Sequence, residues 1–140
     1  FLSDGGTAEP RYAGVGYDLA ATLSEYGAVA RGVGGVNPAG LLSGIVERTR
    51  IIRSKFGIVF EDPSGRHISL GEGRTVSMNF WGFTPTYFQF ARTEFVRFLE
   101  ERRNDPKAEF FIPLVVNRMI EDGLAAVSYT HLTLPTIYSV

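Results

Sequence analysis

Apolar and polar positions along the chain predict several short strands followed by two helices. Residues 11–19 alternate tyrosine, valine and leucine with small residues, which predicts a buried strand. Residues 27–36 and 41–48 predict the two strands of a hairpin. The segment between them, Asn37-Pro38-Ala39-Gly40, has Asn, Pro and Gly at the positions that a β-turn prefers. Residues 20–26 predict a short connection with one helical turn.

The next segments predict a second hairpin and a central strand. Residues 62–65 read Asp-Pro-Ser-Gly, a turn sequence, and residues 66–70 return from it. The pattern of residues 51–60 does not decide between strand and helix. Residues 76–83 carry apolar side chains on both faces, which is typical of a strand covered on both sides. Within that run Asn79 stands between Met78 and Phe80, and a polar side chain in a buried position needs a partner or a ligand.

Two helices follow. Thr84 and Pro85 suit a helix start, as cap and first residue. The apolar stripe expected for the first helix is Phe88, Ala91, Phe95, Phe98 and Leu99, with Glu94 and Arg97 on the solvent face. Residues 104–106 break this helix. The stripe expected for the second helix, starting near Pro113, is Ile112, Val115, Val116, Met119 and Ile120, with Gly123 as its stop. Residues 124–126 enter another strand. This order predicts an α/β layout with an antiparallel insertion.

Composition excludes several classes of partner and binding site. The chain has 140 residues, a length typical of one domain, and a formal net charge of −1, so it has no field to attract nucleic acid or an anionic membrane. It has no cysteine, which excludes disulfides and thiolate metal sites. No apolar run approaches the roughly 20 residues that span a bilayer. No signal segment opens the chain. We therefore expect a cytoplasmic protein without nucleic-acid or membrane partners.

The two ends of the chain carry separate signals. The chain starts at Phe1 rather than Met, and residues 1–6 resemble the end of a helix, so we expect further sequence upstream. Residues 127–136 match the in-frame translation of a transposase-type sequencing adapter. Residues 137–140 fit an index and the next adapter bases, followed by a stop. We therefore predict that 1–126 belong to one protein domain ending near Ala125, and that 127–140 are a non-native tail.

Several short motifs have both a functional and a structural interpretation. The glycines at 14, 16 and 32–35 favour strand or bulge positions over phosphate loops, because no helix pattern follows them. His67 favours a solvated hairpin position over catalysis. Glu25-Tyr26-Gly27 fits equally a loop with a positive-φ glycine or a backbone approach to a ligand. Glu47-Arg48 favours a surface ion pair over ligand contacts, and Glu109 suits the N-terminal end of a helix.

Taken in order, these blocks resemble the C-terminal half of the sugar-phosphate nucleotidyltransferases. The specific part is Met78-Asn79-Phe80-Trp81-Gly82-Phe83 together with Lys107-Ala108-Glu109-Phe110-Phe111-Ile112-Pro113. Shorter matches are Glu25-Tyr26-Gly27, the 37–40 turn, Ile45-Val46-Glu47-Arg48 and Val116-Asn117. The resemblance covers roughly residues 1–125.

The resemblance implies a Rossmann-like α/β domain with a mixed sheet, an antiparallel hairpin insertion and two C-terminal helices. It implies transfer of a nucleotidyl group from an NTP to a phosphorylated acceptor such as a sugar 1-phosphate, with Mg²⁺ and release of pyrophosphate. Such transfer needs positioned phosphates more than a protein nucleophile. The substrate-binding residues implied are Gly27, Glu47, Arg48, Asn79, Trp81 and Gly82. Arg48 stands where the family usually has a lysine that contacts phosphate, and the change of residue leaves the acceptor class open.

The family's nucleotide loop and its metal-binding aspartates have no counterpart within residues 1–125. The resemblance therefore implies that this chain holds acceptor-site residues, has no catalytic or metal-ligating residue of its own, and is inactive alone. Two other functions remain open. One is a fragment of a nucleotide-sugar glycosyltransferase. The other is a non-catalytic carbohydrate-binding module in which Tyr12, Tyr17 and Trp81 stack on a sugar. The sequence leaves the NTP base, the acceptor and the oligomeric state undetermined.

Overall fold

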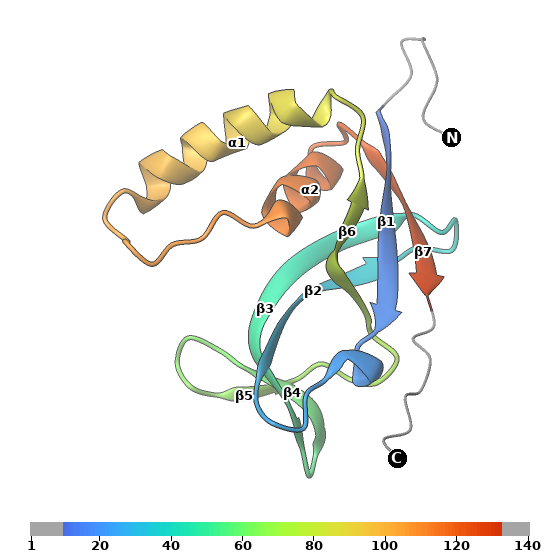
Figure 1. Ribbon diagram of the computed structural model, residues 1–140, viewed down its shortest axis with the longest axis vertical. Helices are drawn as coiled ribbons and strands as arrows, with labels where there is room; N and C mark the ends of the chain where they lie inside the picture. The colour runs from blue at the N-terminus through green and yellow to red at the C-terminus, as the bar shows by residue number, and fades with distance from the viewer. Residues whose placement is uncertain (1–9, 133–140) are drawn as a thin grey trace.

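The computed structural model describes residues 10–132, which form a mixed α/β fold with one curled seven-stranded sheet and two helices (Figure 1). Residues 1–6, expected to end a helix, and residues 133–140 of the expected tail lie outside the described residues. The elements in chain order are β1 (Arg11–Asp18), a 3₁₀ turn η1 (Ala20–Thr22), β2 (Val29–Val36), β3 (Leu42–Ser54), β4 (Gly57–Glu61), β5 (His67–Ser69), β6 (Thr75–Gly82), α1 (Tyr87–Arg102), α2 (Ile112–Glu121) and β7 (Ala126–Leu132).

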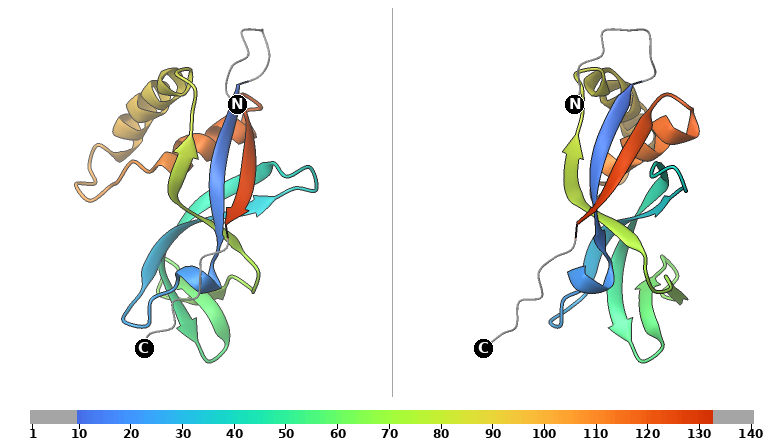
Figure 2. Two further views of the ribbon diagram at one scale, coloured as in Figure 1. Left: turned by 45° about the vertical axis from the view of Figure 1, so that its right-hand side comes forward. Right: turned by 90° about the vertical axis from the view of Figure 1, so that its right-hand side faces the viewer.

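The strands follow the order β5-β4-β3-β2-β6-β1-β7 in the sheet. β1 and β7 are parallel, and every other neighbouring pair is antiparallel. The sheet curls so that β4 and β5 turn away from β1 and β7, as the views in Figure 2 show. The prediction that residues 76–83 form a central strand is confirmed, because β6 lies between β2 and β1. The first hairpin is also confirmed. β3 is longer than predicted, however, and continues through residues 51–54 to pair with β4.

The curl separates two apolar clusters. The first joins β1, β3 and β7 to both helices and centres on residues such as Tyr12, Ile45, Val116 and Met119. The second lies among β3, β4 and β6 and contains Leu19, Ile51, Ile58, Phe60, Leu70 and Val76. Each cluster is built by alternate residues of the strands, so neighbouring positions along one strand contribute to opposite faces.

The second helix follows the sequence prediction closely. Pro113 lies in its first turn, and Val115, Val116 and Met119 are buried against the sheet. Gly123 ends the helix at a φ of 65°, a value that favours glycine. Its N–H donates to the Ile120 carbonyl at 3.1 Å, and the next N–H donates to the Met119 carbonyl at 2.9 Å. These two bonds satisfy carbonyls that the helix end leaves free.

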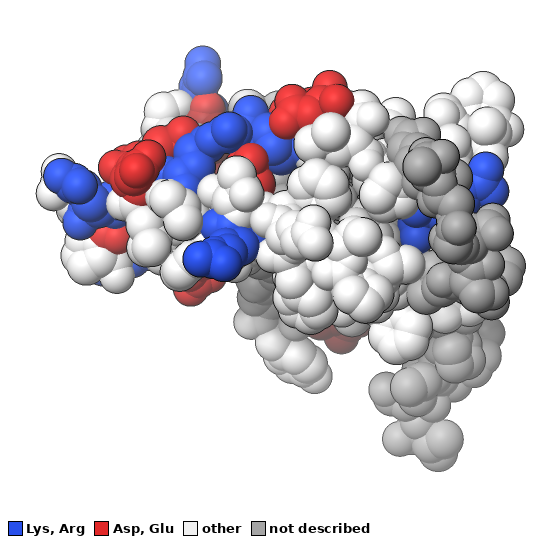
Figure 3. Space-filling model, turned by 90° about the horizontal axis from the view of Figure 1, so that it is seen from above, with Lys and Arg blue, Asp and Glu red and all other residues white. Residues whose placement is uncertain are grey.

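The first helix differs from the prediction at its start and in its buried face. It begins at Tyr87, and Thr84 bonds the Thr86 hydroxyl at 2.7 Å instead of capping the helix. The predicted stripe is wrong in part, since Phe88 is 72% exposed and Phe95 and Leu99 are also exposed. Seen from above in Figure 3, charged side chains of both signs follow this helix beside a broad uncharged surface.

Glu94 explains why α1 buries a different face from the one that its apolar pattern predicts. Predicted on the solvent face, it is only 8% exposed and points between the helices. Its carboxylate pairs with Arg97 at 3.1 Å and with Arg118 of α2 at 3.6 Å. Tyr87 lies on the same face of α1 as Glu94. Its ring stacks on the Phe83 ring, with the two centroids 3.8 Å apart. The ion pair and the aromatic stack together place this face inward, and spacing of apolar residues alone did not reveal it.

Ala126–Leu132 forms the edge strand β7. The strand expected at residues 124–126 therefore starts at Ala126 and continues through residues 127–132, which the adapter match assigns to a tail outside the domain. Val127 and Tyr129 point into the first cluster because they alternate with polar residues. This alternation explains the strand whatever the origin of residues 127–132. The Tyr129 hydroxyl is buried and has no hydrogen-bond partner among the described residues. Burial raises the pKa of that hydroxyl.

The second turn provides a test of local electrostatics. The Asp62 carboxylate accepts bonds from the Ser64 hydroxyl at 2.6 Å and from the Arg66 backbone N–H at 2.9 Å, and these bonds lower its pKa from 3.8 to about 2. We expect an NMR pH titration of the Asp62 carboxyl to give a value near 2, and Ser64→Ala to raise it.

Because the folded pKa of Asp62 lies below the unfolded value, its stabilisation is complete above about pH 4. It declines as the pH falls towards 2, through the folded pKa. Titration of Asp62 near 3.8 in the folded protein would contradict the turn geometry.

Candidate functional site

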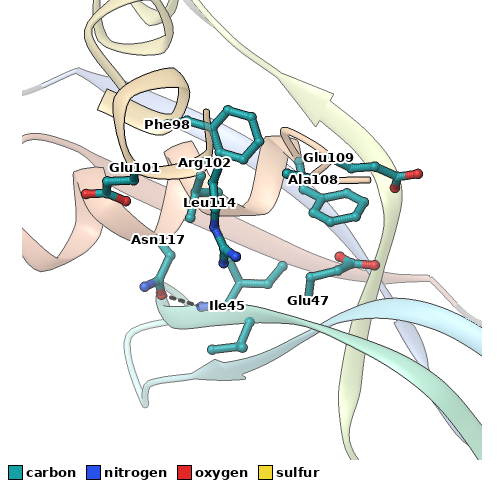
Figure 4. A pocket seen from close by; sticks show the side chains of 11 residues that line it. Ile45, Glu47, Phe98, Glu101, Arg102, Ala108, Glu109, Leu114 and Asn117 are labelled. Atoms are coloured by element: carbon teal, nitrogen blue, oxygen red, sulfur yellow. Dashed lines mark hydrogen bonds between the residues drawn. The ribbon is translucent and has the colours of Figure 1, made fainter. Parts of the chain in front are cut away.

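A cavity of about 400 Å³ lies between the end of α1, the loop that follows it, the first half of β3 and the start of α2 (Figure 4). Its wall combines apolar and charged side chains. The lining residues are Ile45, Val46, Glu47, Phe98, Glu101, Arg102, Ala108, Glu109, Phe111, Leu114 and Asn117. Pockets of a few hundred Å³ with a mainly apolar wall and a few polar groups are typical ligand sites.

Glu47 contributes a half-buried carboxylate to the wall of this cavity. It lies opposite Gly32 of β2, which in turn lies opposite Ser77 of β6. Burial raises the pKa of Glu47, the charge of Arg31 lowers it, and the charge of Glu109 raises it again. Figure 4 shows the Glu47 and Glu109 carboxylates on the same side of the cavity. Two carboxylates placed in this way can accept hydrogen bonds from the hydroxyl groups of a ligand.

Gly32 makes room for this arrangement. A Cβ at this position would come 2.9 Å from the Ile45 side chain and 3.2 Å from the ring of Pro113. The missing side chain therefore lets the start of α2 approach the sheet beside Glu47. The glycine predicted from sequence as a strand residue thus has a packing role next to the cavity.

Arg102 and Asn117 complete the polar lining. Arg102 reaches from the last turn of α1 towards the centre of the cavity, as Figure 4 shows, and pairs with Asp105 at 3.8 Å. Asn117 accepts the Ile45 backbone N–H at 2.9 Å and donates to Glu121 at 2.7 Å. This side chain fixes α2 to the edge of β3 that faces away from β2, where no strand within residues 10–132 pairs with Ile45.

Asn79 lies in an irregular part of β6 and not in a buried run. Gly14 lies opposite Trp81 and Gly16 lies opposite Ser77, so residues 78–80 bulge out against one residue of β1. Pairing with β2 ends at Ser77, and the two strands diverge there. Phe80 is 65% exposed and Asn79 itself is exposed, so the expected cover on both faces is wrong for this half of the strand.

The backbone of Asn79 is left-handed, with a φ of 61°, and its N–H donates to the Ser77 hydroxyl at 2.9 Å. Among the described non-glycine residues only Arg50 shares a positive φ, at 54°. Bulges and such backbone conformations are enriched next to ligand sites.

We expect Asn79→Gly to be more stable than Asn79→Ala by about 1 kcal/mol, because alanine is strained at positive φ and glycine is not. Arg50 is the matched control, because its φ is also positive. Arg50→Gly should likewise be more stable than Arg50→Ala. Urea unfolding of the four variants gives both differences. Equal stability of the two Asn79 variants would show that residue 79 is not held in the left-handed region.

The other predicted site residues are dispersed. Gly27 lies exposed in the loop before β2, has open space around it and does not have a positive φ. Arg48 is adjacent to Glu47 on the strand and so faces the other way, over the Phe60 ring at 4.5 Å. Trp81 stacks on Phe83 with centroids 6.0 Å apart.

Gly82 packs near Ala13, where a Cβ would lie 3.7 Å from the alanine methyl. The prediction of a strand or bulge position for Gly14 and Gly16 is confirmed, because the sheet register shifts between them. The prediction of a solvated hairpin position for His67 is also confirmed, since it is exposed on β5 and lies 4.0 Å from Glu61. Only Glu47 among the predicted site residues lines the cavity of Figure 4.

Sequence reasoning missed Arg102 and treated Glu109 as a helix-end charge. Glu109 precedes α2 by three residues, so the helix-end interpretation was available from the pattern alone. Its place beside Glu47 depends on the loop between the helices, which brings residues 108–111 back over β3. The sequence indicates Asn117 only through the family resemblance, and no local pattern predicts its bond to β3.

No family model matches the chain, and no curated protein matches it. Within residues 10–132, no group of three or more histidine or acidic side chains is arranged to hold a metal ion. Neither α1 nor α2 is long and apolar enough to cross a bilayer.

Proposed function

We propose that this chain carries the acceptor-binding part of a sugar-phosphate-type nucleotidyltransferase with a Rossmann-like domain. The parent enzyme would transfer a nucleotidyl group from an NTP to a phosphorylated acceptor and release pyrophosphate. The observation that carries the proposal is the half-buried Glu47 carboxylate, placed beside Glu109 in a cavity of about 400 Å³. A sugar offers several hydroxyl donors to such a carboxylate pair, and Arg102 supplies donors for an anionic group.

Asn79 supports the proposal from a second element. Glu47, Gly32 and Ser77 lie in one row across three strands, and Asn79 follows Ser77 by two residues at the point where β6 leaves β2. An exposed amide held by a bulge offers both donors and acceptors to a sugar. In this proposal Glu47 on β3 and Asn79 on β6 contact the acceptor from the two strands that flank β2. Gly27, Arg48, Trp81 and Gly82 do not line the cavity of Glu47, and the proposal assigns them no contact with the acceptor.

One of the three aromatic residues that the carbohydrate-binding alternative requires is not accessible to a sugar. Tyr12 is 2% exposed, and its hydroxyl bonds Thr86 at 2.8 Å, so its ring is unavailable for stacking on a sugar. Trp81 is half-buried against Phe83 and Tyr129. We therefore retain the nucleotidyltransferase as the proposed function.

Calorimetric titration with a hexose 1-phosphate tests the proposal. The chain is expected to bind the hexose 1-phosphate more tightly than either the free hexose or inorganic phosphate, because the acceptor offers hydroxyls and an anion together. Equal affinity for the free hexose would favour a carbohydrate-binding module. No binding of any hexose compound would refute the acceptor site.

A further inference from the structure

The outward face of α1 carries four large apolar side chains that are open to solvent. Phe88, Phe95, Val96 and Leu99 are each between 43% and 72% exposed. Successive residues of an α-helix are rotated by about 100°, so these four positions fall within an arc of about 100° and form one stripe. α1 lies farther from the sheet than α2, which leaves this stripe on the outside of the molecule (Figure 1).

The stripe is separate from the parts of α1 that the fold and the cavity use. The buried residues of the helix are Tyr87 and Glu94, which lie on another face. The residues that α1 contributes to the cavity of Figure 4 are Phe98, Glu101 and Arg102. A contiguous set of exposed apolar side chains on one helix face is typical of a surface that binds another protein.

Two arginines belong to the same stripe. Arg92 falls within its arc, and Arg103 follows the helix directly and keeps helical backbone angles. Both are exposed, and within residues 10–132 neither forms an ion pair. An arginine can cover apolar surface with its stem and can stack its guanidinium on an aromatic ring, so both can take part in an apolar contact.

The spacing of the stripe is the same in both directions along the helix. Its six positions are 88, 92, 95, 96, 99 and 103, which are separated by 4, 3, 1, 3 and 4 residues. A dimer with a two-fold axis uses the same patch on both copies, so that patch must be self-complementary. Two copies of α1 that pack antiparallel about a point between residues 95 and 96 meet this condition.

The antiparallel arrangement is also complementary in charge. It places Phe88 level with Arg103 of the second copy, where a guanidinium can stack on the ring. It places Arg92 level with Leu99 of the second copy, which the arginine stem can cover. Arg92 and the second copy's Arg103 remain about 6 Å apart along the helix axis. A parallel arrangement would set each arginine beside its own equivalent, and like charges so placed repel.

We propose that α1 is a dimer interface, through which two copies of this chain pack antiparallel about a two-fold axis between Phe95 and Val96. The contact spans about three helical turns, which is smaller than a standard interface, so we expect a reversible dimer with a Kd in the micromolar range. The cavity of Glu47 stays open in this dimer, because no residue of the stripe lines it. The interface is independent of the nucleotidyltransferase proposal.

Sedimentation velocity of the whole chain tests the interface. The parent chain is expected to pass from monomer to dimer as its concentration rises through the micromolar range. Val96→Asp sets two carboxylates beside each other at the axis and should weaken the dimer about tenfold or more. Phe56→Asp is the matched control, because Phe56 is 81% exposed on the turn between β3 and β4, and it should leave the dimer unchanged. Circular dichroism should show the parent fold in both variants, since both positions are exposed.

Introduced cysteines test the register, because the chain has no cysteine of its own. An equal mixture of Arg92→Cys and Leu99→Cys should give a disulfide-linked dimer on mild oxidation, since the two positions face each other across the axis. Either variant alone should give far less. Its two introduced thiols would lie seven residues, or about 10 Å, apart along the helix axis, which is too far for a disulfide.

Three outcomes would overturn the proposal. The first is a parent chain that stays monomeric throughout the concentration range. The second is a dimer that persists in Val96→Asp, or that Phe56→Asp weakens equally, since the contact would then lie on another surface. The third is disulfide formation in the separate cysteine variants as readily as in their mixture, which is incompatible with the antiparallel register.

Discussion

Replacing Met119 with alanine is expected to lower the free energy of unfolding by about 2–5 kcal/mol, the largest stability effect that we predict. Met119 is 2% exposed and lies on the face of α2 that joins the helices to β1, β3 and β7. Truncation removes apolar contacts and leaves a void, because the surrounding strands are fixed by their ladders and cannot close over it.

The matched control lies on the same helix. Leu114 is 39% exposed, so Leu114→Ala is expected to cost less than about 1 kcal/mol. Met119→Leu, which nearly conserves volume, should cost less than about 1.5 kcal/mol. Urea unfolding of the three variants gives the comparison. Similar losses for Met119→Ala and Leu114→Ala would show that α2 does not dock on the sheet through the Met119 face.

Glu47→Gln is expected to weaken binding of a hexose 1-phosphate by about tenfold or more, since a carboxylate accepts stronger hydrogen bonds from sugar hydroxyls than an amide does. The variant should retain its stability at neutral pH. Burial and Glu109 raise the pKa of Glu47 above its unfolded value, so the ionised carboxylate opposes folding, and a neutral amide removes that penalty.

Glu100→Gln serves as the control for charge, because Glu100 is exposed on α1 and does not line the cavity. It should change neither affinity nor stability. Lost binding together with unchanged stability in Glu47→Gln separates a ligand contact from a structural role. If Glu47→Gln bound the acceptor as tightly as the parent chain, the proposed acceptor site would be refuted.

Local sequence signals predicted the turns and the second helix well. Asn37 accepts the backbone N–H groups of Ala39 and Leu41 at 2.9 and 3.0 Å, which is the bonding that its place in the turn suggested. Gly123 ends α2 because a residue at positive φ is needed there. These features depend on a few neighbouring residues, so the sequence pattern contains the information that fixes them.

Long-range contacts decided the features that the pattern missed. The buried face of α1 follows from the pairing of Glu94 with Arg118, which lie on different helices. Asn79 is exposed because β6 bulges against β1 and leaves β2 after Ser77, a result of sheet register that no local pattern contains.

The sequence by itself therefore determined the turns, most strands, the second helix and the glycine positions of the sheet, because backbone conformation and side-chain spacing are local properties. The family resemblance, and not the local pattern, implied Glu47 as a ligand contact. Only the tertiary structure placed Glu47 beside Glu109 in one cavity and Arg48 in the wall of an adjoining one, which shares Ile45, Val46 and Asn117 with the first. The curl of the sheet and the return of the loop after α1 bring these residues together, and both depend on packing between distant segments.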